Sequence, residues 1–486
     1  MTKTILLIVS TLLFSVSANA QIDTVATNFQ KDFNQFKQSI MQEHQQFKTQ
    51  NDSVFAEFLK ESWKEFQVFY NKKQSVPKPT LQPVAKKEAT IKEIKPKTEK
   101  TDSTRTKTDT PSEIKIKSDA QMPVKNSAGK AMLQYNFYGT ETSVVNPGNL
   151  PPLQQIDAKN IETYFENTCN IDAVSELVIE LRKKQHDMQL NDWGYYKLIE
   201  KTASLVEPSL LRQKLFTWAV LLKSGYNAKI GFANNEVYLM LPTNEEIYSS
   251  YYLTINNTPY YIQTGNNENN SLPKLHVHTA NYPGGKTLSL HIDKIPQLGN
   301  STINRQLLFR NDTIAVTCNK WLIDFYNEYP LCDIQLFFSA PLSKPVLKSL
   351  DNYFNPLFIS ATNRQKINLL LGFVQNSFAY KTDTDQFGRE KYFFPDELFY
   401  YPFSDCEDKS ILFSRLVKHF TGYNCIGLDF PGHVNTAVCF PGEPKGTFIN
   451  FSGKNYTICD PTYTNAPIGY LDSKYENITP EIITFE

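Results

Sequence analysis

Hydrophobic and polar positions near the C-terminus predict a helix followed by two strands. An apolar stripe at helical spacing begins shortly after Cys406 and consists of Ile411, Leu412, Leu416 and Val417. Ser404 and Glu407 have the spacing of a capping box, so the helix is predicted to begin within a residue or two of Cys406. A Pro-Gly turn signal then leads into a strand pattern over 434–438, and a second strand is predicted over 456–459.

The first 71 residues contain two different hydrophobic patterns. An apolar run over 5–16, followed by Ala18-Asn19-Ala20, is typical of an export signal. The run is too short to span a bilayer, which takes about 20 residues. The chain is therefore predicted to be cleaved after Ala20 and to be periplasmic or extracellular, without a membrane span. Over 21–71, aromatic residues at helical spacing predict an amphipathic helical segment that docks within the chain or self-associates.

Residues 72–130 differ in composition from the rest of the chain. They contain 15 Lys and Arg against 7 Asp and Glu, whereas the whole chain has 50 of each kind, and no aromatic residue lies between Tyr70 and Tyr135. Such a segment cannot bury enough apolar surface to offset the entropy lost on ordering. We therefore predict a disordered basic linker. Because the chain is predicted to be exported, we expect no nucleic-acid partner.

The residues after the linker exceed one comfortable core, so two or three folded units are predicted. Patterns over 131–264 predict an α+β unit. Residues 265–345 predict a β-rich unit that includes a strand over 333–338. Residues 346–486 combine a helix over 366–378 with the C-terminal elements described above. The predicted fold class is α+β.

A short internal similarity links the first and last of these units. Superposing Gly225-Tyr226-Asn227 on Gly422-Tyr423-Asn424 aligns the flanking helices and strands without a gap. The superposition pairs Cys406 with Ser209, His433 with Glu236, and Asp460 with a position near Gln263. Two interpretations stay open: a degenerate copy of the same core that lacks a nucleophile, or a chance match between ordinary elements.

Three residues have the types and the placement that nucleophilic thiol catalysis needs. Cys406 is predicted at a helix start, where unpaired N–H groups favour the thiolate and can lower a cysteine pKa to roughly 3.5–7.5. Because Glu407 and Asp408 act in the opposite direction, a nearby cation is required, and His433 is the expected one. Asp460, after the second strand, is expected to orient the imidazole. Each residue alone has a structural explanation, but their order favours a Cys-His-Asp triad.

The same residues carry a resemblance to a known family. Cys406 at a helix start, His433 in PGHVNTAV and Asp460 in DPTY resemble the pattern of the transglutaminase-like superfamily of papain-like cysteine enzymes. The stretch from FVQNSFAYKTD to SDCEDKSILFSRLV is similar to secreted proteins of Bacteroidetes-type bacteria that carry such a domain. The resemblance covers roughly residues 350–486 and implies a papain-like catalytic core in 346–486. The chain departs from the family at Cys425, where Ala or Arg is common.

Two functional classes follow from these observations. In the first, the protein is an exported cysteine peptidase, amidase or acyltransferase that acts on amide or ester bonds of peptide, protein or cell-surface substrates. The backbone N–H of Cys406, with Tyr401 or Gln386, would hold the oxyanion, and neither a metal nor a cofactor is expected. In the second, the domain is a catalytically silent binding or scaffold module of the cell envelope. The other six cysteines are either paired in disulfides or buried as thiols.

Overall fold

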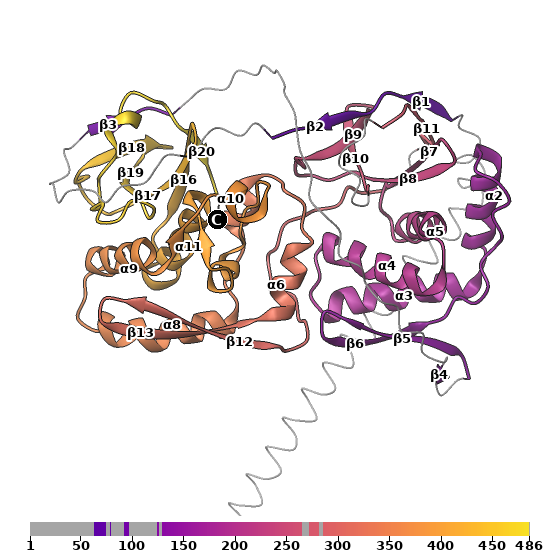
Figure 1. Ribbon diagram of the computed structural model, residues 1–486, viewed down its shortest axis with the longest axis horizontal. Coiled ribbons are helices and arrows are strands. Elements are labelled where there is room, and N and C mark those ends of the chain that lie inside the picture. The colour runs from indigo at the N-terminus through magenta and orange to yellow at the C-terminus, as the bar shows by residue number, and fades with distance from the viewer. Residues whose placement is uncertain are drawn as a thin grey trace, which may run out of the picture. The chain divides into compact units, whose positions relative to one another are not determined.

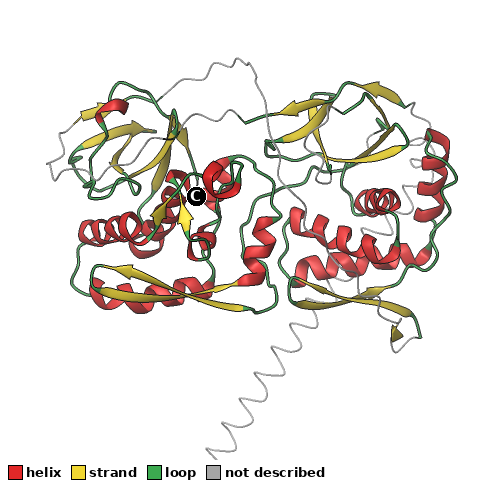
Figure 2. Cartoon of the chain, in the orientation of Figure 1, coloured by secondary structure: helices red, strands yellow, loops and turns green. Residues whose placement is uncertain are grey.

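The computed structural model of the protein describes residues 63–73, 78, 92–96, 124–125, 129–264, 272–280 and 285–485. These residues form an α+β structure that contains helices and several antiparallel or mixed sheets (Figure 2). The predicted export signal and the predicted helical segment up to residue 62 lie outside the described residues. No helix in the described part of the chain has the length and apolar character needed to cross a membrane.

The first half of the described chain combines a small sheet, four helices and a larger sheet (Figure 1). Its small sheet has the strands β4 (Val124–Lys125), β5 (Ala131–Phe137) and β6 (Thr140–Val145). Its helices are α2 (Ala158–Cys169), α3 (Asp172–Asp187), α4 (Asp192–Val206) and α5 (Leu210–Lys223). The larger sheet contains β7 (Lys229–Ala233), β8 (Glu236–Leu241), β9 (Ser250–Ile255), β10 (Thr258–Ile262) and β11 (Leu275–Val277).

The second half begins with a long hairpin and a group of helices. The hairpin pairs β12 (Thr302–Phe309) with β13 (Asp312–Asn319). The helices that follow are α6 (Lys320–Asn327), α7 (Ile334–Ser339), α8 (Lys344–Phe358) and α9 (Asn363–Ser377). The helix α9 confirms the prediction for 366–378. The strand predicted over 333–338 is wrong, because this segment forms α7 and buries Leu336, Phe337 and Phe338.

The remaining elements surround the helix α11 (Cys406–Thr421). Before it come β14 (Ala379–Tyr380), the short helix α10 (Asp383–Phe387), a 3-10 helix η1 (Pro395–Phe399) and β15 (Phe403–Ser404). After it come β16 (Cys425–Phe430), β17 (His433–Val438), β18 (Thr447–Phe451), β19 (Lys454–Cys459), a second 3-10 helix η2 (Ser473–Tyr475) and β20 (Glu481–Ile483). The two strands predicted from the sequence are confirmed as β17 and β19.

The two large sheets share a strand order. The first runs β11-β7-β8-β10-β9 and the second runs β20-β16-β17-β19-β18. Even the register of the central hairpins corresponds: Ala233 pairs with Glu236 across one two-residue turn, and Phe430 pairs with His433 across the other. In both halves a helix, α5 or α11, packs against the two strands of this hairpin. This is the pairing order that the predicted repeat requires.

Segments that precede residue 96 extend the edges of both sheets. The strands β1 (Lys64–Phe66) and β2 (Phe69–Asn71) pair with β11 and β9, and β3 (Lys92–Ile94) pairs in parallel with β18. The helix predicted over 21–71 is therefore wrong for 64–71, and the predicted disordered linker is wrong for 92–94. The physical reason is that exposed strand edges supply backbone hydrogen-bond partners, which local hydrophobic spacing does not reveal.

The core of the second half lies between α8, α9, α11 and the long hairpin. The helix α11 is buried on most of its faces, from Cys406 to Ser414 and again at Leu416 and Val417. It ends at Gly422, whose φ of 72° is the left-handed conformation that closes many helices. The predicted β-rich unit 265–345 thus contributes to both halves: β11 completes the first sheet, whereas β12 and β13 pack on α8 and α9.

Candidate active site

The start of α11 fixes the position of Cys406. Asp405 is the residue that caps the helix, and its N–H donates to Asp408 Oδ2 at 3.1 Å. The other oxygen of Asp408 accepts the N–H of Phe393 at 3.0 Å. The capping pair is therefore one residue later than the predicted pair of Ser404 and Glu407, and Cys406 is the first residue of the helix. Its side chain is only 1% exposed.

His433 and Asp460 form a buried hydrogen-bonded pair. His433 is the first residue of β17, Asp460 directly follows β19, and the two strands are neighbours in the sheet. His433 Nε2 lies 2.7 Å from Asp460 Oδ2, and the N–H of Thr462 donates to Asp460 Oδ1 at 2.9 Å. Burial raises the pKa of Asp460, but the charge of His433 and these hydrogen bonds lower it by more, so the pKa is below its usual value.

Contacts between α11 and β17 hold the helix that begins at Cys406 against the strand that begins at His433. Ser410, one helical turn after Cys406, donates its hydroxyl hydrogen bond to the carbonyl of Val434, the neighbour of His433, at 3.0 Å. The His433 ring stacks on Tyr475, with centroids 5.3 Å apart. Burial raises the pKa of the Tyr475 phenol, and the charge of a thiolate at Cys406 raises it further. His433 Nδ1 is buried and has no hydrogen-bond partner in the described part of the chain. The imidazole thus has one nitrogen, Nε2, that bonds Asp460, and one, Nδ1, that no described residue binds.

The Cys406 thiol itself is held by its neighbour in the helix. It donates a hydrogen bond to Glu407 Oε2 at 3.0 Å. Burial raises the pKa of the thiol well above its usual value, the charges of Glu407 and Asp405 raise it further, and Lys78 opposes them. The expected low pKa is therefore wrong for this arrangement. The favourable position at the helix start is outweighed by burial and by two adjacent carboxylates.

Lys78 is the cation that the structure places beside the thiol. Its Nζ lies 2.6 Å from Glu407 Oε1 and also forms an ion pair with Asp405. Asp383 Oδ2 and Glu390 Oε1 lie 3.8 Å and 3.3 Å from the same nitrogen. We call Asp383, Glu390, Asp405 and Glu407 the carboxylate cluster. The sequence assigned the role of the neighbouring cation to His433, and Lys78 was missed because it lies in a Lys-rich, low-complexity segment.

The carboxylate cluster also has spacings that suit a cation ligand set. Ligand oxygens of Asp383, Glu390 and Glu407 lie within 4.8 Å of one another, as do those of Asp383, Asp405 and Asp408. Burial, together with the charges of Asp408 and Glu407, raises the pKa of Asp383 to about 9. Burial also raises the pKa of Glu407, but Lys78 and the donated hydrogen bonds lower it by more, to about 2.

The two oxyanion candidates have different surroundings. Tyr401 donates to Asn327 Oδ1 at 2.6 Å, and its ring stacks on Phe393. Its hydroxyl is therefore engaged with α6. Both polar atoms of the Gln386 side chain are buried without a hydrogen-bond partner among the described residues. Gln386 lies on α10, the helix that also carries Asp383, so it is the better candidate of the two.

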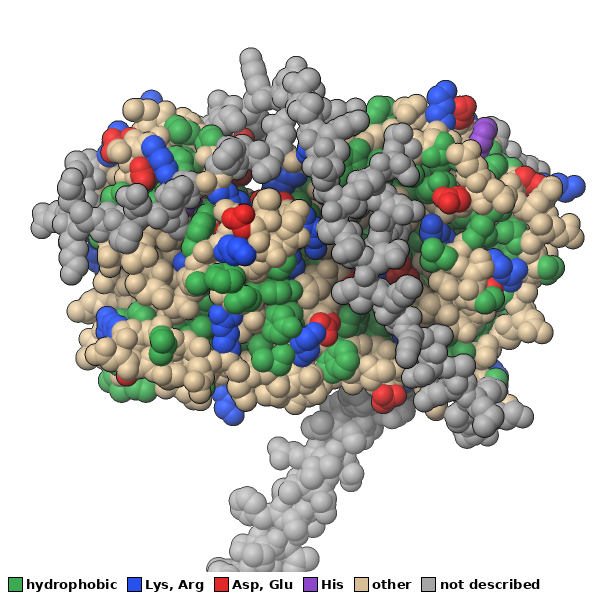
Figure 3. Space-filling model, in the orientation of Figure 1, with side chains coloured by type: hydrophobic (Ala, Val, Ile, Leu, Met, Phe, Trp, Pro, Cys, Tyr) green, Lys and Arg blue, Asp and Glu red, His purple; other side chains and the backbone are tan. Residues whose placement is uncertain are grey.

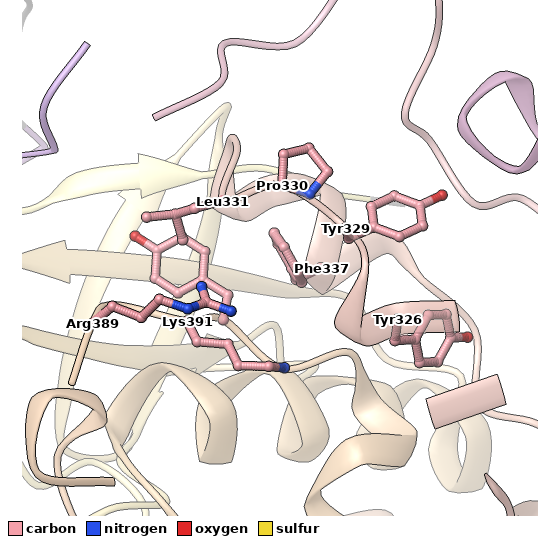
Figure 4. Close-up of a pocket in the computed structure, with 8 residues that line it drawn as sticks. Tyr326, Tyr329, Pro330, Leu331, Phe337, Arg389 and Lys391 are labelled. Atoms are coloured by element: carbon pink, nitrogen blue, oxygen red, sulfur yellow. The ribbon is translucent and has the colours of Figure 1, made fainter. Parts of the chain in front are cut away.

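A separate small pocket lies beside the site. Its volume is about 10 Å³, roughly the space that one water molecule needs. Aromatic side chains, including Tyr326, Tyr329 and Phe337, line it together with Arg389 and Lys391 (Figure 4). No member of the predicted triad lines this pocket, so it does not define the candidate active site.

All seven cysteines are free thiols. The alternative of buried thiols therefore describes this structure, and only Cys439 is partly exposed. On the face shown in Figure 3, side chains of both charge signs are interspersed, as expected for a chain with equal numbers of acidic and basic residues.

Comparison of the chain with protein-family models, with curated proteins and with solved structures found no match.

Proposed function

We propose that the protein is an exported cysteine enzyme of the transglutaminase-like, papain-like type that acts on amide or ester carbonyls. The observation that carries the proposal is the buried hydrogen-bonded pair of His433 and Asp460, because His433 begins β17 and α11, which begins at Cys406, packs against that strand. Among the described residues His433 Nδ1 is buried without a hydrogen-bond partner, and because such burial is costly, its retention favours a role in proton transfer.

The proposed reaction uses these groups in turn. His433 Nδ1 takes the proton of the Cys406 thiol, and the sulfur attacks the substrate carbonyl carbon. The oxyanion that forms accepts hydrogen bonds from the Cys406 N–H and from Gln386 Nε2. When the tetrahedral intermediate collapses, the imidazolium gives its proton to the leaving amine or alcohol. Water or an amine then attacks the thioester and releases Cys406. Asp460 holds the imidazole orientation throughout.

A direct experiment tests this proposal. The full chain is incubated with a peptide and ester library, and mass spectrometry follows both products and a covalent acyl adduct on Cys406. We expect products with the native chain and with the control Cys439→Ala, whose thiol lies outside the triad. Cys406→Ala and His433→Ala should abolish them. Products that persist in Cys406→Ala would refute the proposal.

One observation favours a second candidate function, a catalytically silent binding module. The thiol is buried and its proton is held by Glu407 rather than by His433. If this state is permanent, iodoacetamide will label Cys406 only after unfolding, and the library will give neither adduct nor product. Slow labelling of the folded chain that requires His433 would support the enzyme instead.

We also propose that the first half is a degenerate copy of the catalytic core. The shared strand order and hairpin register support this idea. The positions that correspond to the triad carry Ser209, Glu236 and, by the register of β10, Thr264, which is one residue beyond the predicted Gln263. Ser209, Glu236 and Thr264 include no thiol, so a bracing or binding role suits this half.

A further inference from the structure

Tyr380 has a buried hydroxyl group that no described residue binds. The residue ends β14, a short strand that pairs in parallel with β15, and its register partner is Ser404. The N–H of Lys381 donates to the Ser404 carbonyl at 3.1 Å and holds this pairing. The Tyr380 hydroxyl oxygen is buried, yet it has no hydrogen-bond partner in the described part of the chain. Because an unpaired buried hydroxyl lowers stability, its retention favours a role other than packing.

The strand pairing places Tyr380 beside the first turn of α11. Ser404 ends β15, and α11 begins two residues later at Cys406. Register partners in neighbouring strands direct their side chains to the same face of a sheet, so the Tyr380 ring and the Ser404 side chain share a face. The N–H of Cys406 belongs to the same short segment. Because it is the first N–H of the helix, it has no carbonyl partner within the helix.

The surroundings of the Tyr380 phenol keep it protonated. Burial raises the pKa of the phenol, and the charges at Cys406 and then Asp405 raise it further, whereas Lys78 lowers it. A protonated tyrosine has one O–H donor, and the raised pKa keeps this donor present throughout the neutral pH range. The hydroxyl is therefore a neutral hydrogen-bond donor next to the helix start, and no described residue accepts from it.

We infer that Tyr380 is a further catalytic residue, whose hydroxyl donates a hydrogen bond to the carbonyl oxygen of the substrate as that oxygen gains negative charge. The inference rests on the proposed function, in which Cys406 attacks an amide or ester carbonyl. It adds a donor to the Cys406 N–H and Gln386 Nε2, and it replaces the predicted Tyr401, whose hydroxyl donates to Asn327. Because no described residue binds the Tyr380 hydroxyl, it has no such hydrogen bond to break before it meets the oxyanion.

Two reagents that react with the same thiol test the role of the hydroxyl. p-Nitrophenyl acetate transfers its acetyl group to the Cys406 sulfur and releases p-nitrophenolate, through an intermediate whose former carbonyl oxygen is negatively charged. Iodoacetamide alkylates the same sulfur with loss of iodide, and no oxygen gains charge. Both rates depend on access to the thiol and on its thiolate fraction, so the ratio of acetylation to alkylation largely cancels these two factors. Mass spectrometry of the Cys406 peptide from the full chain, at short reaction times, gives both rates.

The expected result is a selective loss of acetylation. Tyr380→Phe should lower the ratio of acetylation to alkylation about 100-fold, the size of the loss when one oxyanion donor is removed. Its melting temperature should be no lower than that of the native chain, because the removed hydroxyl bonds no described residue. Tyr326→Phe is the matched control and should keep the native ratio. The Tyr326 hydroxyl is also buried without a partner among the described residues, but it lies on α6.

The other outcomes separate this inference from the proposed function. A Tyr380→Phe chain with the native ratio would overturn the inference alone. An equal loss of acetylation and alkylation would also overturn it, because the hydroxyl would then hold the thiolate and not the oxyanion. If iodoacetamide alkylates Cys406 in the native chain but p-nitrophenyl acetate does not acetylate it, the proposed function fails and the inference falls with it.

A second change covers the case in which Tyr380→Phe does not fold. Incorporation of 3-fluorotyrosine at position 380 keeps both the ring and the hydroxyl but makes the phenol more acidic, and a more acidic phenol is a stronger hydrogen-bond donor. The ratio of acetylation to alkylation at Cys406 should then rise severalfold. An unchanged ratio in this chain would overturn the inference.

Discussion

Replacing Glu407 with Gln should make the Cys406 thiol more acidic. The Glu407 carboxylate accepts the thiol hydrogen bond at 3.0 Å, and its charge is one of the causes that raise the pKa of Cys406. Two unit charges about 4 Å apart interact by about 4 kcal/mol at an effective dielectric constant of about 20. Since a tenfold change in an equilibrium constant corresponds to about 1.4 kcal/mol, Glu407→Gln should lower the pKa of the thiol and raise the thiolate-to-thiol ratio about 1000-fold.

The expected change in reactivity is smaller than the change in ionisation. The thiolate fraction rises about 1000-fold when the pKa of the thiol lies above the working pH in both chains. The thiolate also becomes less nucleophilic, with a Brønsted coefficient of about 0.4–0.5, so the net gain in alkylation rate at pH 7.5 is roughly 30- to 60-fold. Lys78 remains next to the site and keeps favouring the thiolate.

The assay is the rate of Cys406 carbamidomethylation against pH, measured by peptide mass spectrometry with Cys439 as an internal reference. Because the thiol is buried, labelling requires access to it, and a matched control shows how far the loss of one neighbouring carboxylate changes access by itself. Glu390→Gln is the matched control, since Glu390 belongs to the carboxylate cluster but does not bond the thiol. A folded Glu407→Gln chain that alkylates no faster at pH 7.5 than the Glu390→Gln chain would refute this account.

Three further outcomes are expected. Ser410→Ala removes the hydrogen bond from α11 to Val434 and should lower the free energy of unfolding by about 1–2 kcal/mol in urea, whereas Ser414→Ala, whose hydroxyl bonds a carbonyl in its own helix, should cost less. The pKa of Asp383 is raised by burial and by neighbouring acids from 3.8 to about 9, so its contribution to stability is present below pH 3.8 and is lost as the pH rises towards 9. Asp383→Asn should therefore flatten the fall in melting temperature between pH 5 and 9, and an unchanged slope would exclude this carboxyl as its source. Asp460→Asn should reduce any turnover by at least 100-fold while Cys406 labelling stays measurable, and retained turnover would remove Asp460 from the mechanism.

Local sequence patterns predicted the elements that carry the candidate triad. Helical spacing after Cys406 and alternation over 434–438 correspond to α11 and β17, because each pattern reflects one buried face of one element. The same logic failed for 64–71. There Phe66, Val68 and Tyr70 also alternate, and the segment pairs with sheet edges supplied by β11 and β9. Two periodicities were present, and only the partner strands decided between them.

The sequence by itself determined which chemical groups are present near the C-terminus and in what order the elements bearing them follow one another. Only the tertiary structure decided their environment. It brought Lys78 to Asp405 across 327 residues, and it buried Cys406 among carboxylates that raise the pKa of the thiol. The reason is physical: periodicity and capping are set by neighbours within a few residues, whereas burial and charge–charge contacts depend on chain segments that meet only in the folded state.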